Sequence, residues 1–306
     1  MRIETTNSRP YPPVEGIEVE HRFVDIGSCR IHVVEAGAGP PLVMYHGWPQ
    51  HWWMWRKQIP FFARHFRVIV PDMRGFGWSD ATSGGYGKDD LADDFVRLLR
   101  ALGHEHVRLL SHDWGGWIGY IVSAKYQGLI TQHFATNIPP LWPKVSLKMI
   151  PATLRFGYMF RIAMPYLGPS MLMRSKHFVH HLFTRGGTHP EGWTEAEKNA
   201  FSDQFQEPAR ARASAKLYGT FLLREYIPVG LLGRYRKCRI QTPTRLLFGV
   251  QDFALALSWL RGHERYTDDF QIELVPGAGH FIVDERPDLV NQRALDFFTD
   301  NKYALT

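Results

Sequence analysis

Short apolar runs alternate with amphipathic stretches over residues 1–138, and the same alternation returns over residues 237–306. Apolar runs of four or five residues bounded by turn residues predict buried strands, whereas stretches with a period near 3.6 predict helices. Strands that alternate with helices are typical of a parallel sheet covered on both faces. The predicted strands are 41–45, 66–70, 107–110, 244–248 and 271–275, with a hairpin over 18–34, and the predicted helices are 53–63, 88–102, 117–125 and 287–298.

The middle of the chain has a different pattern. From residue 139 to residue 236 no strand-like run occurs, and helical spacing of Met, Phe, Leu and Tyr dominates. Thr194 and Glu197 have the spacing of a capping box, which predicts a helix start at that point. The predicted fold class is therefore α/β: a mostly parallel central sheet with helices on both faces, formed by 1–138 and 237–306, with an all-helical lid inserted at 139–236.

Composition narrows the class of protein. The 306 residues are 44% apolar and 22% charged, which is enough to bury a large core. The formal charge of +6 comes from scattered Lys and Arg, and no nucleic-acid module is present, so no nucleic-acid partner is expected. No apolar stretch reaches the roughly 18 residues of a membrane span. Residues 1–16 lack a secretory h-region, and Cys29 and Cys238 form no disulfide framework, so a cytoplasmic protein without a membrane partner is expected.

The strongest chemical signal is the run Ser111-His112-Asp113-Trp114-Gly115-Gly116, which joins a predicted strand to a predicted helix. Small residues around a central side chain indicate a tight turn that lifts this side chain above the edge of the sheet. The turn also aims backbone N–H groups at a developing anion. In the common form of the turn the central residue is Ser; here it is Asp113. Taken alone, Asp113 as a nucleophile and Asp113 as a simple helix cap are comparable interpretations.

Two further motifs make a family resemblance visible. His46-Gly47-Trp48-Pro49 follows a predicted strand, and residues 70–79 read V-P-D-M-R-G-F-G-W-S. With the D-W-G-G turn, these motifs resemble the epoxide hydrolases of the α/β-hydrolase fold, and the resemblance spans nearly the whole chain. In that fold the nucleophile, the acid and the histidine follow one another along the chain. Asp252 and His280 stand in the corresponding places after the last two predicted strands.

The resemblance implies a role for each of these residues. Asp113 would attack an sp³ carbon and form an alkyl ester, and His280, oriented by Asp252, would activate the water that cleaves this ester. The backbone N–H groups of Trp48 and Trp114 would stabilise the oxyanion. Related enzymes sometimes carry the acid after an earlier strand, where this chain has Asn137. Asn cannot carry a negative charge, so Asp252 is the predicted acid; Asp72, in the 70–79 segment, is predicted to be structural.

An epoxide oxygen leaves as an alkoxide and needs an acid, which this family supplies from two lid tyrosines. Position and spacing favour Tyr158 and Tyr218, which would also contact the substrate together with Trp48 and Trp114. Gly219 follows Tyr218 where a larger polar residue is frequent in the family. The rival lid tyrosines are Tyr166 and Tyr226.

Three alternatives remain. A haloalkane dehalogenase shares the Asp nucleophile but typically has Asn where Trp48 stands. A fluoroacetate-type dehalogenase would need a basic pocket, for which Arg155 and Arg161 are available, although a solvated face explains them better. A non-catalytic binding or scaffold protein of the same fold would be free to lose a triad residue, and none is missing here.

The implied partners are a small apolar epoxide and water. The apolar residues of the lid predict an apolar pocket. No cofactor is implied, because neither a P-loop nor a dinucleotide fingerprint occurs. No metal is implied either, because the histidines of the lid, His177, His180, His181 and His189, have no carboxylate or Cys at ligand spacing. The sequence leaves the oligomeric state open, a homodimer included.

Overall fold

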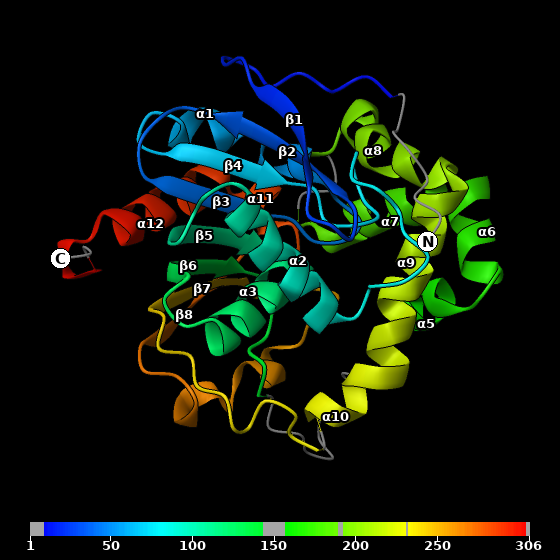
Figure 1. The fold of residues 1–306 in the computed structure, drawn as a ribbon. Helices are drawn as coiled ribbons and strands as arrows, with labels where there is room; N and C mark the ends of the chain where they lie inside the picture. The colour runs from blue at the N-terminus through cyan, green and yellow to red at the C-terminus, as the bar shows by residue number, and fades with distance from the viewer. Residues whose placement is uncertain (1–8, 143–156, 189–191, 231, 304–306) are drawn as a thin grey trace.

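The computed structural model describes residues 9–142, 157–188, 192–230 and 232–303. In these residues an eight-stranded sheet has the order β1-β2-β4-β3-β5-β6-β7-β8 (Figure 1). Strand β2 is antiparallel to β1 and β4, and every other neighbouring pair is parallel. The predicted α/β class with a mostly parallel sheet is confirmed. The strands are β1 Glu20–Asp25, β2 Arg30–Ala36, β3 Pro41–Tyr45, β4 Arg67–Pro71, β5 Val107–His112, β6 Ile130–Thr136, β7 Thr244–Gly249 and β8 Phe270–Val275.

Strand β6 was not predicted from the sequence. Its centre carries Gln132 and His133, which interrupt the apolar run expected of a buried strand. Both side chains are buried, yet each has a polar partner: Gln132 Nε2 donates to the Phe297 carbonyl at 2.5 Å, and His133 Nε2 lies 2.7 Å from Ser111 Oγ. Hydrogen bonds of this kind offset the cost of burying polar groups. Contacts from distant parts of the chain therefore allow a strand that the local pattern conceals.

Helices cover both faces of the sheet (Figure 1). On one face lie α2 Lys88–Ala101 and α3 Trp114–Lys125, and on the other lie α1 Ile59–Phe62, α11 Ile282–Glu285 and α12 Pro287–Thr299. The helix predicted over 53–63 is wrong: a 3₁₀ turn, Trp52–Trp55, precedes the short α1. Pro60 lies in the first turn of α1. Proline has no N–H group and clashes with the preceding turn, so a helix begins at such a residue more readily than it passes through.

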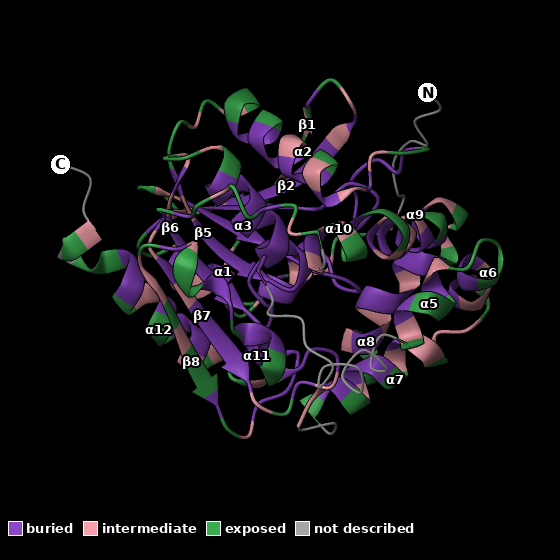
Figure 2. Cartoon of the chain, turned by 90° about the horizontal axis from the view of Figure 1, so that it is seen from below, coloured by how far each residue is buried: buried purple, intermediate pink, exposed green. Residues whose placement is uncertain are grey.

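The core lies between the sheet and these helices, where the buried residues gather (Figure 2). Leu42, Val43 and Met44 of β3 are completely buried, as are Leu109 and Leu110 of the neighbouring β5. Burial of each such side chain stabilises the fold by about 1.5–3 kcal/mol. The two strands that precede the predicted oxyanion and nucleophile motifs are therefore among the most firmly packed parts of the molecule.

Between β6 and β7 the described residues contain helices and no strand. The capping box predicted in this region is present: Thr194 Oγ1 accepts from the Glu197 N–H at 3.2 Å, and Glu197 Oε2 accepts from the Thr194 N–H at 2.9 Å. The boundaries at 138/139 and 236/237 stay predictions. The lid elements are α5 Gly157–Ala163, α6 Leu167–Arg174, α7 His177–Gly186, α8 Glu195–Ser202, α9 Pro208–Thr220, a π-helical turn Phe221–Glu225 and α10 Tyr226–Gly230.

Polar contacts join the lid to the loops at the carboxyl ends of the strands. The side chain of Gln204 accepts from the Gly77 N–H at 2.9 Å and donates to the Pro49 carbonyl at 2.8 Å. The indole N–H of Trp48 donates to Ser214 Oγ of α9 at 3.0 Å. The bond to Ser214 fixes helix α9 to the loop that follows β3, and the Gln204 bonds hold the residues just before α9 to the loops after β3 and β4.

Within the described ranges, no helix is long and apolar enough to cross a membrane. The same part of the chain contains no group of three or more His, Cys, Asp or Glu side chains arranged to hold a metal ion. His189 lies outside the described residues. Cys29 and Cys238 are both free.

Candidate active site

Asp113 occupies the turn between β5 and α3. Its φ angle of +48° is in a region that non-glycine residues rarely adopt, at a typical cost of about 1–3 kcal/mol. A Cβ atom on Gly47 would lie 2.5 Å from Asp113 Oδ2, and one on Gly116 would lie 2.5 Å from Ile138. The small residues of both motifs therefore make room for the turn. Asp113 is the N-cap residue of α3 by position, but its side chain does not make the capping hydrogen bond to the second or third helical residue that a simple helix cap would provide.

Two backbone N–H groups converge on the Asp113 carboxylate. The N–H of Trp48, in the loop after β3, donates to Asp113 Oδ2 at 3.1 Å. The N–H of Trp114, the first residue of α3, also bonds to this carboxylate. These are the two groups predicted from the sequence, and they lie where an oxyanion on Asp113 would form.

Asp252 and His280 form a buried pair. His280 Nδ1 lies 2.8 Å from Asp252 Oδ2, and Asp252 Oδ1 accepts from the backbone N–H groups of Ala254 at 2.7 Å and Leu255 at 2.9 Å. The side chains of His280 and Asp252 are 6% and 0% exposed, respectively. Because the Asp252 carboxylate accepts a hydrogen bond from Nδ1–H of His280, Nε2 is the ring nitrogen that can release and receive a proton. This is the orientation that a general base requires.

The charges of the site are coupled. Burial raises the pKa of Asp113 to about 6, although the charge of His280 and the N–H groups of Trp114 and Trp48 act in the opposite direction. Burial alone would lower the pKa of His280, but the charge and hydrogen bond of Asp252, together with the charge of Asp113, raise it to about 9. At neutral pH the free site therefore holds an aspartate anion beside a charged imidazolium.

Tyr158 and Tyr218 lie next to one another above this site. Tyr218 of α9 is 1% exposed, and its ring centroid is 5.2 Å from that of Trp48 and 5.9 Å from that of Trp114. The ring of Tyr158, in α5, is 6.0 Å from that of Tyr218. Loss of water contact raises the pKa of both phenols well above 10, and the negative charge of Asp113 raises it further. Both therefore stay protonated at neutral pH and can donate hydrogen bonds.

The rival lid residues point elsewhere. Tyr166 is 88% exposed and Tyr226 is 37% exposed, so both lie on the surface of the lid. Arg161, considered for a carboxylate-binding pocket, is exposed as well. Arg155 lies outside the described residues. Within the described residues, Tyr158 and Tyr218 are thus the lid tyrosines whose pKa responds to the charge of Asp113.

Asn137 and Phe253 also belong to the site, and the sequence did not assign a role to either. Asn137 follows β6 with a φ angle of +43°, and its Nδ2 donates to Asp252 Oδ2 at 2.7 Å and to the Gly279 carbonyl at 3.1 Å. The ring of Phe253 is 5.8 Å from the His280 ring. The signal for Asn137 was a polar residue directly after a strand, but β6 itself was not predicted. This position, considered as the site of an alternative acid, instead supports the predicted acid.

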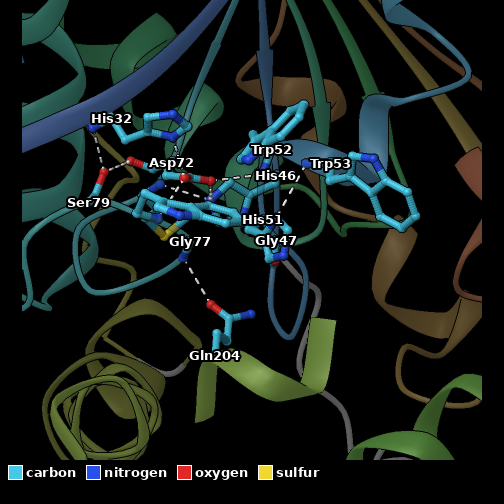
Figure 3. A network of polar contacts seen from close by, with 12 residues as sticks. His32, His46, Gly47, His51, Trp52, Trp53, Asp72, Gly77, Ser79 and Gln204 are labelled. Carbon is cyan, nitrogen blue, oxygen red and sulfur yellow. Dashed lines mark hydrogen bonds and ion pairs between the residues drawn. The ribbon is translucent and has the colours of Figure 1, made fainter. Parts of the chain in front are cut away.

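Asp72 organises the loops beneath the site (Figure 3). Its carboxylate accepts from the N–H groups of Trp52 and Trp78, both at 2.8 Å, and lies 2.7 Å from His32 Nδ1. Burial would raise the pKa of Asp72, but the hydrogen bond and charge of His32 hold it well below the usual range. Within the same network the Met73 N–H donates to His46 Nε2 at 2.8 Å, which orients the first residue of the His-Gly-Trp-Pro motif. This geometry is that of a structural carboxylate.

Comparison with known proteins places the chain in a family. The family model described as alpha/beta hydrolase fold matches residues 40–287. A soluble epoxide hydrolase from Corynebacterium sp. (strain C12) is 30% identical over 303 residues, covering 92% of this chain and 98% of that one. A fluoroacetate dehalogenase from Burkholderia sp. is 26% identical over 305 residues, covering 94% and 96%, respectively.

Among solved structures, that of the epoxide hydrolase CorEH without ligand matches with a TM-score of 0.82 and 27% sequence identity. The match covers 92% of this chain and 99% of that chain. The chain therefore belongs to the α/β hydrolase fold family, and the resemblance to epoxide hydrolases that its motifs indicate is confirmed.

Proposed function

We propose that the protein is an epoxide hydrolase that converts an apolar epoxide to a vicinal diol through an ester on Asp113. The observation that carries this proposal is the pair of protonated phenols, the half-buried Tyr158 and the buried Tyr218, beside a buried carboxylate. The relatives named as epoxide hydrolases support it. The reaction needs only the epoxide and water.

In the first step a lone pair of the Asp113 carboxylate attacks one ring carbon, and a C–O ester bond forms. The ring C–O bond breaks, and its electron pair stays on the departing oxygen. A proton from Tyr158 or Tyr218 neutralises this alkoxide while the other phenol donates a hydrogen bond. An aspartate with a pKa of about 6 is ionised at neutral pH, and as a more basic carboxylate it is a better nucleophile than a more acidic one.

In the second step water cleaves the ester. Esterification removes the negative charge of Asp113, which is one of the contributions that raise the pKa of His280. His280 therefore gives up its proton more readily in the ester than in the free enzyme, and then accepts one from water. The resulting hydroxide attacks the ester carbonyl, and the N–H groups of Trp48 and Trp114 stabilise the oxyanion. When the C–O bond to the product breaks, the His280 proton passes to the diol and Asp113 is left as a carboxylic acid. The Asp113 proton and the proton that His280 released earlier then convert the tyrosinate back to a phenol and His280 back to an imidazolium.

The lid tyrosines also distinguish this reaction from dehalogenation. A halide leaves without a proton, so a dehalogenase has no need of two phenols beside the nucleophile. An epoxide oxygen is a poor leaving group and does need them. A binding or scaffold role would not require the hydrogen-bonded pair of Asp252 and His280 beside Asp113.

The test is one turnover of styrene oxide in ¹⁸O-labelled water, followed by mass spectrometry of the peptide that contains Asp113. We expect ¹⁸O in the Asp113 carboxylate, because water attacks the ester carbonyl and not the substrate carbon. Asp113→Ala is the control and should form neither label nor diol. An unlabelled peptide from an active enzyme would exclude the ester, and halide release from a haloalkane or fluoroacetate without diol formation would establish the dehalogenase alternative.

A further inference from the structure

A lysine is buried in the seam between the core and the lid. Lys88 is the first residue of α2, and it is 1% exposed. Its Nζ donates to the Leu217 carbonyl of α9 at 2.6 Å and lies 3.3 Å from Glu225 Oε2. The Lys88 backbone N–H also donates to Glu225 Oε1 at 2.7 Å. A single residue of the core thus contacts the lid at both Leu217 and Glu225.

Burial of the Lys88–Glu225 pair costs free energy. Taking an ammonium and a carboxylate out of water costs several kcal/mol for each ion, and their attraction often only offsets this cost. Burial lowers the pKa of Lys88 to about 8 even though Glu225 counteracts it. An apolar side chain of similar length would fill the same volume without this cost. A role beyond stability would account for the buried charge.

The bond to Leu217 falls at a change of helix type. Helix α9 ends at Thr220, and a π-helical turn, Phe221–Glu225, follows. The N–H of Phe221 is shared between the carbonyls of Leu217 and Tyr218 at this junction. Such junctions satisfy their backbone carbonyls less regularly than an α-helix does, and they occur often at functional sites. Lys88 provides the Leu217 carbonyl with a charged donor from the core.

The same ammonium also contacts the neighbour of the nucleophile. Lys88 Nζ is 4.5 Å from the ring centroid of Trp114, within the range of a cation–π contact. The ring of Trp114 in turn meets that of Tyr218 edge to face, with centroids 5.9 Å apart. Lys88 therefore contacts two neighbours of Tyr218: the adjacent backbone at Leu217, and the indole ring that packs against the phenol.

We propose that Lys88, paired with Glu225, is a positioning residue that holds the Tyr218 phenol in place for ring opening by fixing the junction of α9 and the π-helical turn to the core. The proposal rests on the proposed function. A displacement of about 1 Å can reduce a rate about 10²-fold, so a loosened junction would slow proton donation to the epoxide. Hydrolysis of the ester depends on His280 and Asp252, which lie on other loops. Its rate should therefore stay the same when the junction is loosened.

The test measures ring opening and ester hydrolysis separately, by rapid-quench kinetics with styrene oxide. Lys88→Met preserves the length of the side chain, and Lys88→Met combined with Glu225→Gln avoids an unpaired buried carboxylate. We expect ring opening to fall by about 10- to 100-fold in both variants, while ester hydrolysis stays within about twofold. Lys57→Met is the matched control, since Lys57 also donates to a backbone carbonyl, that of Asp284, at 3.1 Å, but lies away from α9.

A double-mutant cycle with Tyr218→Phe shows whether Lys88 acts through Tyr218. If it does, Lys88→Met changes ring opening by less than about twofold in the Tyr218→Phe background, because coupled residues are not additive. A full additive loss, or equal losses in both steps, would overturn the positioning role. Diol formation and labelling of Asp113 in the wild type test the proposed function separately. Independently of activity, Lys88→Met should speed hydrogen exchange at the amides of residues 217–225, and unchanged exchange would also contradict the proposal.

Discussion

At the scale of single residues, the site depends on charges that are removed from water. Burial raises the pKa of Asp113. The acidic neighbours of His280 raise the pKa of this histidine, although burial alone would lower it. The pKa shift of His280 comes from the charges of neighbouring carboxylates, whereas that of Asp113 comes from removing its charge from water, and titration can test both. Tyr218 is buried and Tyr158 is half-buried, and both phenols hold their protons because loss of water contact raises their pKa.

The first prediction concerns pH. Asp113 attacks only as an anion, and its pKa is about 6. The ring-opening rate should therefore be constant above pH 7 and fall by about tenfold per unit below pH 6, as the anionic fraction falls. Single-turnover rates with styrene oxide between pH 4.5 and 8 would measure this, with circular dichroism as the control for folding. A flat profile down to pH 5 would contradict a raised pKa.

The second prediction concerns the lid tyrosines. Tyr158→Phe combined with Tyr218→Phe removes both proton donors while keeping the rings, so ring opening should fall by about 10²- to 10⁴-fold. Tyr166→Phe is the matched control, because Tyr166 is 88% exposed, and it should have wild-type rates. Ring opening by the double variant at the wild-type rate would remove both residues from the mechanism.

At the scale of elements, strand ends and helix starts bring the site together. The loops after β3, β5, β6, β7 and β8 contribute Trp48, Asp113, Asn137, Asp252 and His280, respectively. Since β5, β6, β7 and β8 are neighbours in the sheet and parallel, their carboxyl ends lie side by side. Residues far apart in the sequence therefore reach one point, even where the lid is inserted between two of these strands.

The third prediction tests the contribution of β6. Asn137→Ala removes the bond of 2.7 Å to Asp252 Oδ2, and Asp252 then orients His280 less firmly. We expect ester hydrolysis to slow by about fivefold, in line with the loss of one hydrogen bond worth about 1 kcal/mol. Ring opening should change by less than twofold, because the hydrogen bonds of the Asn137 side chain go to Asp252, Gly279 and Gly249 and not to Asp113. Equal losses in the two steps would indicate a general packing defect instead.

At the scale of the whole molecule, the lid is attached to the core by polar contacts as well as by packing. Arg56 bridges the two parts: its guanidinium lies 2.7 Å from Glu197 of α8 and 2.6 Å from Asp284 of α11. Its side chain is 10% exposed, so solvent screens these pairs weakly. Together with Lys88 and Gln204, Arg56 ties the lid to the loops that carry the catalytic groups.

The fourth prediction follows from this bridge. Arg56→Met leaves two carboxylates without their cation, and the free energy of unfolding should fall by about 3 kcal/mol, as expected when a buried pair loses one partner. Denaturant titration would measure the change. Glu197→Gln is the milder comparison, since it retains the pair with Asp284 and should cost less. An Arg56→Met variant as stable as the wild type would show that packing alone holds the lid.

The sequence by itself determined the features that depend on neighbours within a few residues. The turn around Asp113, the His-Gly-Trp-Pro loop and the capping box at Thr194 are local, because steric room and backbone hydrogen bonds there are set by adjacent side chains. Most strands were predicted for the same reason, since a strand buried on both faces is a continuous apolar run.

Tertiary structure alone decided the rest. Strand β6 forms because distant partners satisfy Gln132 and His133, and Asn137 reaches Asp252 because β6 lies beside β7. The seam at Lys88 likewise depends on a lid carbonyl 129 positions further along the chain. Burial and pairing of polar groups are properties of the folded molecule, so no local pattern records them. The sequence marked Asp113 as the predicted nucleophile, and the fold supplied the surroundings that set its charge and the contacts that hold its partners.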